Sequence, residues 1–223
     1  MSINVAIDGP AGAGKSTIAR MLARELNYIY VDTGAMYRAM ALYMIEHKID
    51  VSHLDEVGSA CDAITIDIQY SAGEQQVILN GKNVNDFIRT ETVSEMSSKI
   101  SAIPEVREKL LSLQQSLAAA ENVIMDGRDI GTHVLPNADV KIFLTADAHV
   151  RAVRRYEEFI AKGVSCTLEN VEREVIERDE RDMNRAIAPL KQAEDAVRVD
   201  TSAMTIEEVV CYLKNLIGQA VAR

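Results

Sequence analysis

The stretch Gly9-Pro10-Ala11-Gly12-Ala13-Gly14-Lys15-Ser16 decides the fold of this chain. It matches the pattern G-x-x-x-x-G-K-[S/T] at every fixed position. The apolar, β-branched run over residues 3–7 predicts a buried strand before it, and helical spacing of apolar side chains over residues 15–26 predicts a helix after it. A plain structural turn would not need a lysine at its end. The sequence therefore predicts a phosphate-binding loop.

The residues of this loop suit a nucleoside triphosphate such as ATP. Glycines let backbone N–H groups converge on an anion, and the positive end of the helix dipole favours negative charge. We expect Lys15 to reach the β- and γ-phosphates and the Ser16 hydroxyl to bind Mg²⁺. The expected ATP-binding residues are Gly9, Pro10, Ala11, Gly12, Ala13, Gly14, Lys15, Ser16 and Thr17.

Length and charge limit the remaining possibilities. The chain has 223 residues and a formal net charge of −10, with no Trp and 4% aromatic residues. This length predicts one domain with a sizeable core. The acidic balance and scarce aromatic residues argue against a nucleic-acid partner. No apolar run approaches the roughly 20 residues of a membrane span, and the N-terminus lacks a signal pattern, so we expect a cytoplasmic protein without membrane contact.

The cysteines and histidines show no pattern of a metal or disulfide framework. The three cysteines, Cys61, Cys166 and Cys211, lie far apart, which predicts reduced thiols buried like small apolar residues. The four histidines lack metal-ligand spacing and are expected at the surface or in turns.

Strand and helix patterns alternate along most of the chain. Further strands are predicted at residues 28–31, 122–125, 140–144 and 196–199, and further helices at residues 35–48, 50–63 with Ser52 as the cap, 91–101, 104–120, 146–162, 168–185 and 205–220. This alternation indicates right-handed crossovers between parallel strands. The predicted fold class is α/β, a P-loop NTPase three-layer fold with a five-stranded parallel sheet. Ligands bind beyond the carboxyl ends of such strands, where Gly9, Asp32 and Asp126 fall.

Residues 64–90 differ in character from the rest. Isoleucines at 64, 66 and 68 alternate with polar residues, and the Asn80-Gly81 dipeptide is a strong turn signal. We therefore expect a small antiparallel β insertion.

A second group of charged residues lies on the helix predicted to end at 185. Arg178, Arg181, Asp182 and Arg185 follow at i, i+3, i+4 and i+7, so they share one face. An exposed helix with ion pairs such as Arg178–Asp182 would show the same pattern. In a chain with a phosphate loop, three arginines on one face favour polyphosphate binding.

Two further residues lie at predicted strand ends. Arg38 follows Asp32-Thr33-Gly34 and could bind a second phosphate. Asp126 ends a predicted core strand and could approach Mg²⁺ through water, although capping a helix is an alternative role.

Four motifs together resemble the bacterial-type cytidylate kinases, which belong to the P-loop nucleoside monophosphate kinase superfamily. They are Asp8–Thr17, Asp32–Arg38, Asp126–Thr132 and Glu177–Arg185. The resemblance runs nearly end to end. Family members often carry Ser where Thr33 stands, and the hydroxyl is retained here.

The resemblance implies transfer of phosphate from ATP to CMP or dCMP with Mg²⁺, by a monomer that binds small nucleotides. It implies a core at about 1–34, 121–150 and 186–223, a monophosphate-binding region at about 35–120 and a short lid at about 151–185. The residues implied to act on the transferring phosphoryl group are Lys15, Arg128, Arg178 and Arg181. Those implied to bind the acceptor nucleotide are Thr33, Arg38 and Arg128 at the phosphate, Arg178 and Asp182 at the ribose, and Ser98, Arg107, Asp129 and Arg185 at the base.

Two other functions remain open from sequence. One is a P-loop kinase for another nucleoside monophosphate, UMP or AMP. The other is a nucleotide-dependent switch or motor, although the Asn-Lys-x-Asp motif usual in GTPases is absent.

Overall fold

The computed structural model describes residues 2–71 and 73–221. The chain divides into two compact bodies, which we treat separately. The sheet body comprises residues 1–30 and 121–223, and the hairpin body comprises residues 31–120. Among the described residues, no helix is both long enough and apolar enough to cross a membrane.

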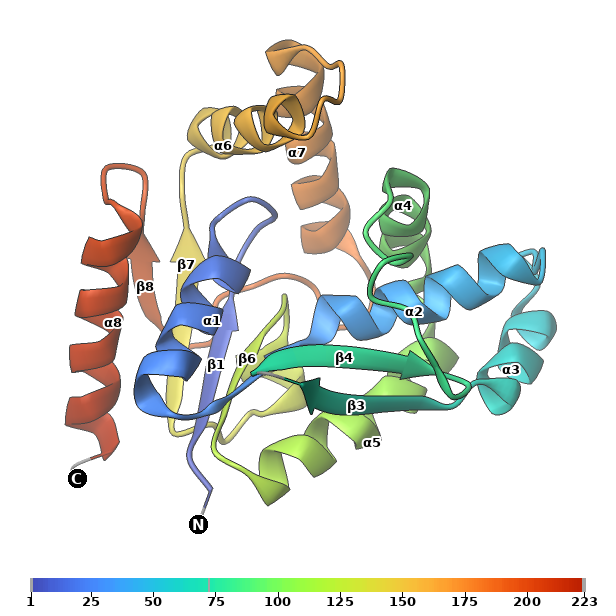
Figure 1. The fold of residues 1–223 in the computed structure, drawn as a ribbon, viewed down its shortest axis with the longest axis horizontal. Coiled ribbons are helices and arrows are strands. Elements are labelled where there is room, and N and C mark those ends of the chain that lie inside the picture. The colour runs from blue at the N-terminus through green and yellow to red at the C-terminus, as the bar shows by residue number, and fades with distance from the viewer. Residues whose placement is uncertain (1, 72, 222–223) are drawn as a thin grey trace. The chain divides into compact units, whose positions relative to one another are not determined.

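The sheet body is built on parallel strands (Figure 1). Its elements are β1 (Asn4–Asp8), α1 (Lys15–Leu26), the start of β2 (Ile29–Asp32), β6 (Val123–Asp126), a π-helical turn η1 (Ile130–Val134), β7 (Val140–Thr145), α6 (Ala148–Ala161), α7 (Leu168–Asn184), β8 (Val197–Asp200) and α8 (Ile206–Val221). The five strands lie in the order β2-β6-β1-β7-β8. Val5 of β1 pairs in parallel with Ile124 of β6 and Val140 of β7, which confirms the predicted parallel sheet.

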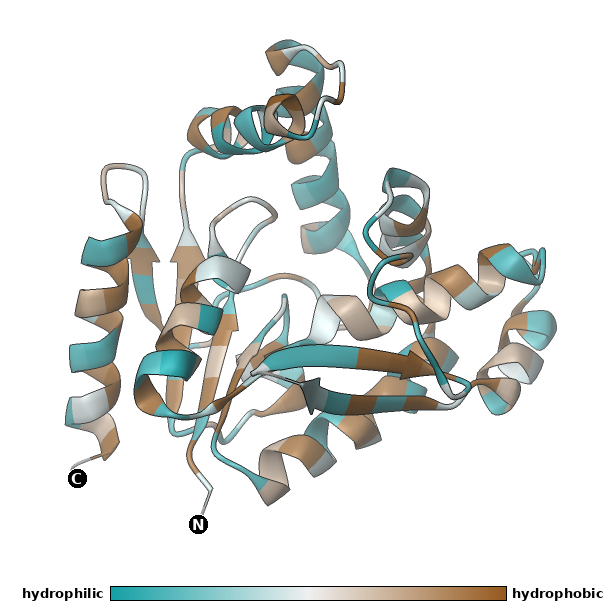
Figure 2. Ribbon diagram, in the orientation of Figure 1, coloured by the Kyte–Doolittle hydropathy of each residue, from teal (hydrophilic) through white to brown (hydrophobic). Residues whose placement is uncertain are grey.

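The core of the sheet body lies between these strands and the two helices α1 and α8. Ile7, Leu22, Leu144 and Leu213 are all fully buried in it. Because α1 places its apolar residues three and four apart, one stripe of the helix faces the sheet. The strands that α1 and α8 cover are largely hydrophobic. Helix α7, in contrast, is mostly hydrophilic (Figure 2). This packing fixes the carboxyl ends of β1 and β6, which carry predicted site residues.

The hairpin body combines helices with a small antiparallel sheet. Its elements are α2 (Thr33–Glu46), α3 (Leu54–Ala63), β3 (Ile66–Ser71), β4 (Glu74–Leu79), β5 (Lys82–Asn83), α4 (Glu91–Ile100) and α5 (Pro104–Ala120). Ile68 pairs with Val77, and Asn80 and Gly81 turn the chain with φ of 46° and 81°. The predicted β insertion is confirmed.

Several predicted details are wrong. The helix α3 begins at Leu54 with His53 as its N-cap residue, because the Ser52 hydroxyl donates instead to Asp50 at 2.7 Å. All three cysteines are free thiols, but only Cys61 is buried as predicted, since Cys166 is half-buried and Cys211 is exposed. The histidines are exposed, as predicted.

Candidate active site

The predicted phosphate loop joins β1 to α1. Gly9 has a φ of 147°, and a Cβ there would collide with the backbone carbonyl of Leu144 on β7. Gly14 caps α1 with a φ of 82° and offers no side chain to the first helical N–H groups. These glycines let the backbone bend tightly and leave the helix N-terminus suited to an anion.

Lys15 is buried against the phosphate loop. It is 5% exposed, and its Nζ donates to the Pro10 carbonyl at 2.7 Å. Burial, and then the nearby Arg128 guanidinium, lower the pKa of Lys15 well below its usual value. The carboxylates that act in the opposite direction are those of Asp126, Asp8 and Asp182. An anion entering the loop would favour the charged ammonium, so Lys15 suits a phosphate ligand.

Ser16 and Asp126 bring two oxygen ligands together. The Ser16 hydroxyl donates to Asp126 Oδ2 at 2.8 Å, and the Tyr30 hydroxyl donates to Oδ1 at 3.0 Å. Asp126 therefore lies beside the first residues of α1. Within the described residues no cluster of three or more His, Cys, Asp or Glu could hold a metal. One carboxylate and one hydroxyl fit Mg²⁺ that is bound mainly through substrate phosphates and water.

Arg128 follows the end of β6 and pairs with Asp182 of helix α7. Its Nε donates to Asp182 Oδ2 at 2.9 Å, and its Nη1 donates to the Gly127 carbonyl at 3.2 Å. Burial raises the pKa of Asp182, but the Arg128 and Arg178 guanidiniums outweigh this and hold it below the usual value. The structure thus brings Arg128 and an ionised Asp182 together.

Asp129 and Arg185 form a second pair beside the first. Arg185 Nη2 lies 3.2 Å from Asp129 Oδ1, and each side chain is 7% exposed. Arg185 Nε also donates to the Ala188 carbonyl at 2.6 Å. The helix ends at Asn184, so Arg185 lies just beyond it and not within it as predicted. Ending the helix there lets the chain turn and direct Arg185 at Asp129.

The other two arginines of α7 differ from each other. Arg178 is partly buried and acts on Asp182 by its charge. Arg181 is exposed, and its Nε donates to the Glu177 carbonyl of its own helix at 3.3 Å. The structure therefore groups Arg178 with Asp182 and Arg128, and leaves Arg181 outside this group.

In the hairpin body, Asp32 organises the start of α2. Its Oδ1 accepts from the Ala35 N–H at 2.8 Å, and its Oδ2 accepts from Arg38 Nη2 at 3.0 Å, with Arg89 Nη2 at 3.8 Å. Burial opposes ionisation of Asp32, but Arg38, the Ala35 N–H and Arg89 together lower its pKa. The buried Thr33 is the first residue of α2, two residues earlier than the predicted helix start.

Ser98 and Arg107 lie near one another in the hairpin body. The Arg107 guanidinium is buried, donates to the Ser101 carbonyl at 3.1 Å and lies 5.9 Å from the centre of the Tyr37 ring. Ser101 Oγ in turn donates to the Ser98 carbonyl at 2.9 Å. Both predicted residues thus contact Ser101, at the end of α4.

Sequence comparison identifies the family. A model of the cytidylate kinases matches residues 5–219. The chain belongs to the cytidylate kinase family. A cytidylate kinase of Carboxydothermus hydrogenoformans is 50% identical over 219 residues, which cover 97% of this chain and 98% of that protein. A cytidylate kinase of Bacillus cytotoxicus is 45% identical over 221 residues, covering 99% and 98% respectively. The resemblance seen in the four motifs is confirmed, and the chain is a kinase.

Solved structures with a similar fold support the fold class. A gluconokinase from Sinorhizobium meliloti 1021 superposes with a TM-score of 0.50 at 14% identity, covering 97% of this chain and 92% of that one. An uncharacterized protein from Eubacterium ventriosum superposes with a TM-score of 0.53 at 14% identity, covering 98% and 99%. These likenesses concern the fold alone.

Three residues of this cytidylate kinase family member were not predicted from sequence. Asp8 accepts backbone hydrogen bonds from η1, and Gln75 of the β insertion holds the backbone of Asp32. Arg151, on α6, donates to the Ala11 carbonyl of the phosphate loop at 2.9 Å and pairs with Asp179 of α7 at 2.7 Å. Asp8 directly precedes the loop glycine Gly9, and this position could have marked it as a candidate site residue. Arg151 and Gln75 look like ordinary surface residues in the sequence.

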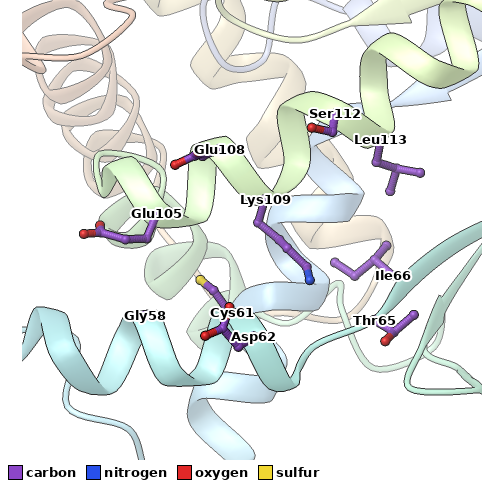
Figure 3. A pocket seen from close by; sticks show the side chains of 10 residues that line it. All are labelled: Gly58, Cys61, Asp62, Thr65, Ile66, Glu105, Glu108, Lys109, Ser112 and Leu113. Atoms are coloured by element: carbon purple, nitrogen blue, oxygen red, sulfur yellow. The ribbon is translucent and has the colours of Figure 1, made fainter.

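A separate cavity of about 750 Å³ lies within the hairpin body (Figure 3). Lys109 extends from α5 into the space between α5 and α3. Among the described residues, its lining includes none of the predicted site residues. The cavity is therefore distinct from the side chains discussed above.

Proposed function

We propose that this kinase transfers the γ-phosphoryl group of ATP to CMP or dCMP, giving ADP and CDP or dCDP. The observation that carries the proposal is the buried Asp129–Arg185 pair next to Arg128. This pair would offer the base a carboxylate and a guanidinium, beside the arginine that we assign to the acceptor phosphate.

Cytosine suits this pair. It offers an amino donor at position 4 and acceptors at N3 and O2. Asp129 would accept a hydrogen bond from the amino group. Arg185, Arg107 and Ser98 would donate to the acceptors N3 and O2. Uracil carries a carbonyl where cytosine has the amino group, so Asp129 would face it without a proton to share. Leaving a buried polar group unpaired makes such a site strongly selective.

The phosphate chemistry would be divided among several cations. We assign Lys15 to the β- and γ-phosphates, with Gly9–Thr17 as the ATP loop. Thr33, Arg38 and Arg128 would bind the acceptor phosphate, and Arg178 and Asp182 the ribose side. Arg178 and Arg181 would stabilise charge on the phosphoryl group in flight. Mg²⁺, held with Ser16 and Asp126, would supply charge neutralisation at the phosphates.

No general base is needed, because the acceptor is already a phosphate oxygen. The protein has to hold the two nucleotides in line and exclude water, which would otherwise hydrolyse ATP. We assign water exclusion to the lid at about 151–185 and acceptor binding to the region at about 35–120, in a monomeric enzyme.

The test is ADP release measured with CMP, dCMP, UMP and AMP as acceptors, together with an assay without acceptor. We expect CMP and dCMP to be used with the highest kcat/KM. Faster turnover of AMP or UMP than of CMP would contradict the proposal. Equal phosphate release without any acceptor would favour a switch or motor ATPase.

In the same assay, Asp129→Ala should reduce kcat/KM for CMP while the KM for ATP changes little. An unchanged preference for CMP over UMP in this variant would show that the base is recognised elsewhere.

A further inference from the structure

The π-helical turn η1 is capped by a residue far away in sequence. Asp129 occupies its N-cap position, yet the Asp129 side chain makes no capping hydrogen bond to the described turn. Instead, the carboxylate of Asp8 accepts from the Ile130 N–H and the Gly131 N–H, each at 2.7 Å. One oxygen serves each donor. The cap therefore comes from the end of β1, 122 residues earlier in the chain.

This exchange of roles matters because an Asp at a helix N-cap ordinarily uses its own carboxylate. The first N–H groups of a helical turn need acceptors, and unpaired buried donors are costly. Since Asp8 satisfies both donors, the Asp129 carboxylate is not drawn back onto its own turn. It lies instead 3.2 Å from Arg185.

The contact between Asp8 and the turn η1 is tightly packed. Asp8 is 4% exposed. A Cβ added at Gly131 would lie 3.4 Å from Asp8 Oδ2 and 3.2 Å from Cδ of Lys141. The turn is thus held between the Asp8 carboxylate and the aliphatic stem of Lys141, whose Nζ is occupied by Asp195 at 2.7 Å. A bulkier or differently charged neighbour would move the turn, and Asp129 with it.

We propose that Asp8 is a positioning residue for nucleobase recognition, because its carboxylate caps η1 and so holds the Asp129 carboxylate toward Arg185 and the base. Asp8 itself touches neither nucleotide in this role. The inference rests on the proposed function of Asp129 as the residue that accepts from the cytosine amino group.

The decisive variant is Asp8→Asn, which keeps the size of the side chain but leaves only one oxygen to accept. We expect the ratio of kcat/KM for CMP over UMP to fall about tenfold or more, since small displacements of a binding group have effects of this size. The KM for ATP should rise by a smaller factor than the CMP-over-UMP ratio falls, because the variant also removes the Asp8 charge that favours the Lys15 ammonium. The matched control is Asp139→Asn, because Asp139 accepts a single backbone N–H, from Asn4 at 2.8 Å, at the opposite end of β1.

A second variant covers the case in which Asp8→Asn does not fold. Gly131→Ala should place a methyl group 3.2 Å from Cδ of Lys141, which should displace the turn slightly and lower the same CMP-over-UMP ratio. Equal losses for CMP, UMP and ATP in either variant would assign Asp8 a merely structural role and overturn the inference.

Asp129→Ala measured in parallel separates the two proposals. If it loses CMP selectivity while Asp8→Asn and Gly131→Ala retain it, the inference about Asp8 fails and the role of Asp129 stands. If Asp129→Ala itself retains selectivity, both fail.

Discussion

The loops that follow β1 and β6 leave neighbouring strands of one sheet, but they are built in different ways. The loop after β1 relies mainly on its own residues, since glycines shape it and Lys15 bonds to the loop's own Pro10 carbonyl, with Arg151 of α6 as a partner from outside the loop. The loop after β6 relies on residues elsewhere. Arg128 is held by Asp182, Asp129 by Arg185 and the following turn by Asp8.

This difference indicates which parts of the chain can supply phosphate binding and which can supply base recognition. Phosphate binding needs backbone N–H groups and one cation, which a short contiguous segment supplies. The selective base recognition that we propose for the second loop needs side chains of opposite charge held rigidly, and these come from distant segments. The first therefore depends less on residues outside its own segment than the second, which depends on several distant partners.

Replacing Lys15 gives the largest expected effect. Lys15→Ala should lower kcat on the order of a thousandfold, because an essential cation at the phosphates is lost. The thermal midpoint should change little, since a buried charge is removed together with its desolvation cost. Coupled ADP-release kinetics and a thermal melt measure both, with the exposed Lys191→Ala as the control. Turnover within tenfold of wild type would show that the loop does not act through this lysine.

Replacing Arg128 tests the second loop. Arg128→Lys keeps the charge but loses the planar donor group that reaches Asp182, so kcat/KM for CMP should fall about a hundredfold. Arg173→Lys is the control, because Arg173 bonds only to the exposed Asn170 side chain of its own helix in the described contacts. Similar kinetics in both variants would mean that charge alone suffices at Arg128, which would remove the contrast between the loops.

The β insertion offers a milder test of dependence on distant partners. Gln75 Oε1 accepts from the Asp32 N–H at 2.8 Å, and Gln75 Nε2 donates to the Asp32 carbonyl at 3.3 Å. Because Asp32 in turn binds Arg38, Gln75→Ala should raise the KM for CMP several-fold and lower stability by about 1–2 kcal/mol. The control is Gln69→Ala in the same hairpin, whose amide bonds to Asp67. An unchanged KM would limit the insertion to a stabilising role.

The smallest expected effect is a pH dependence of stability. Burial raises the pKa of Asp8 to about 6, and the nearby Asp129 charge adds to this rise. The two backbone N–H donors, of Gly131 and Ile130, and the Lys15 charge oppose it. A raised pKa in the folded state means that the stability contribution is complete below the ordinary value of 3.8 and is lost as pH rises through about 6. Between pH 5 and 7, the unfolding free energy of wild type should therefore fall by about 1 kcal/mol relative to Asp8→Asn. Urea unfolding at several pH values measures this, and parallel pH profiles would contradict it.

Much of the fold follows from local patterns. The helices α1 and α5 begin and end at the predicted residues, and the hairpin turns at Asn80-Gly81 as expected. These segments carry strong local signals, namely helical apolar spacing and a residue pair that favours positive φ. The start of α3 was missed because an Asp50–Ser52 contact competed with helix capping.

The turn η1 could not be predicted, because its N–H groups are satisfied by Asp8 from another strand. The same holds for the Arg128–Asp182 pair. Local patterns place both residues in plausible elements, but an i,i+4 ion pair of Asp182 with Arg178 was an alternative interpretation, and the sequence shows no contact with Arg128. The roles of the individual residues in binding and catalysis stay predictions, which the kinetic measurements on the variants test.

The sequence by itself determined the phosphate loop, the order of strands and helices and the family, since each depends on residues that are adjacent or regularly spaced. Only the tertiary structure decided which carboxylate faces which arginine, and which residue caps the turn after Asp129. The physical reason is that hydrogen bonds and ion pairs act over a few ångströms of space, regardless of distance along the chain.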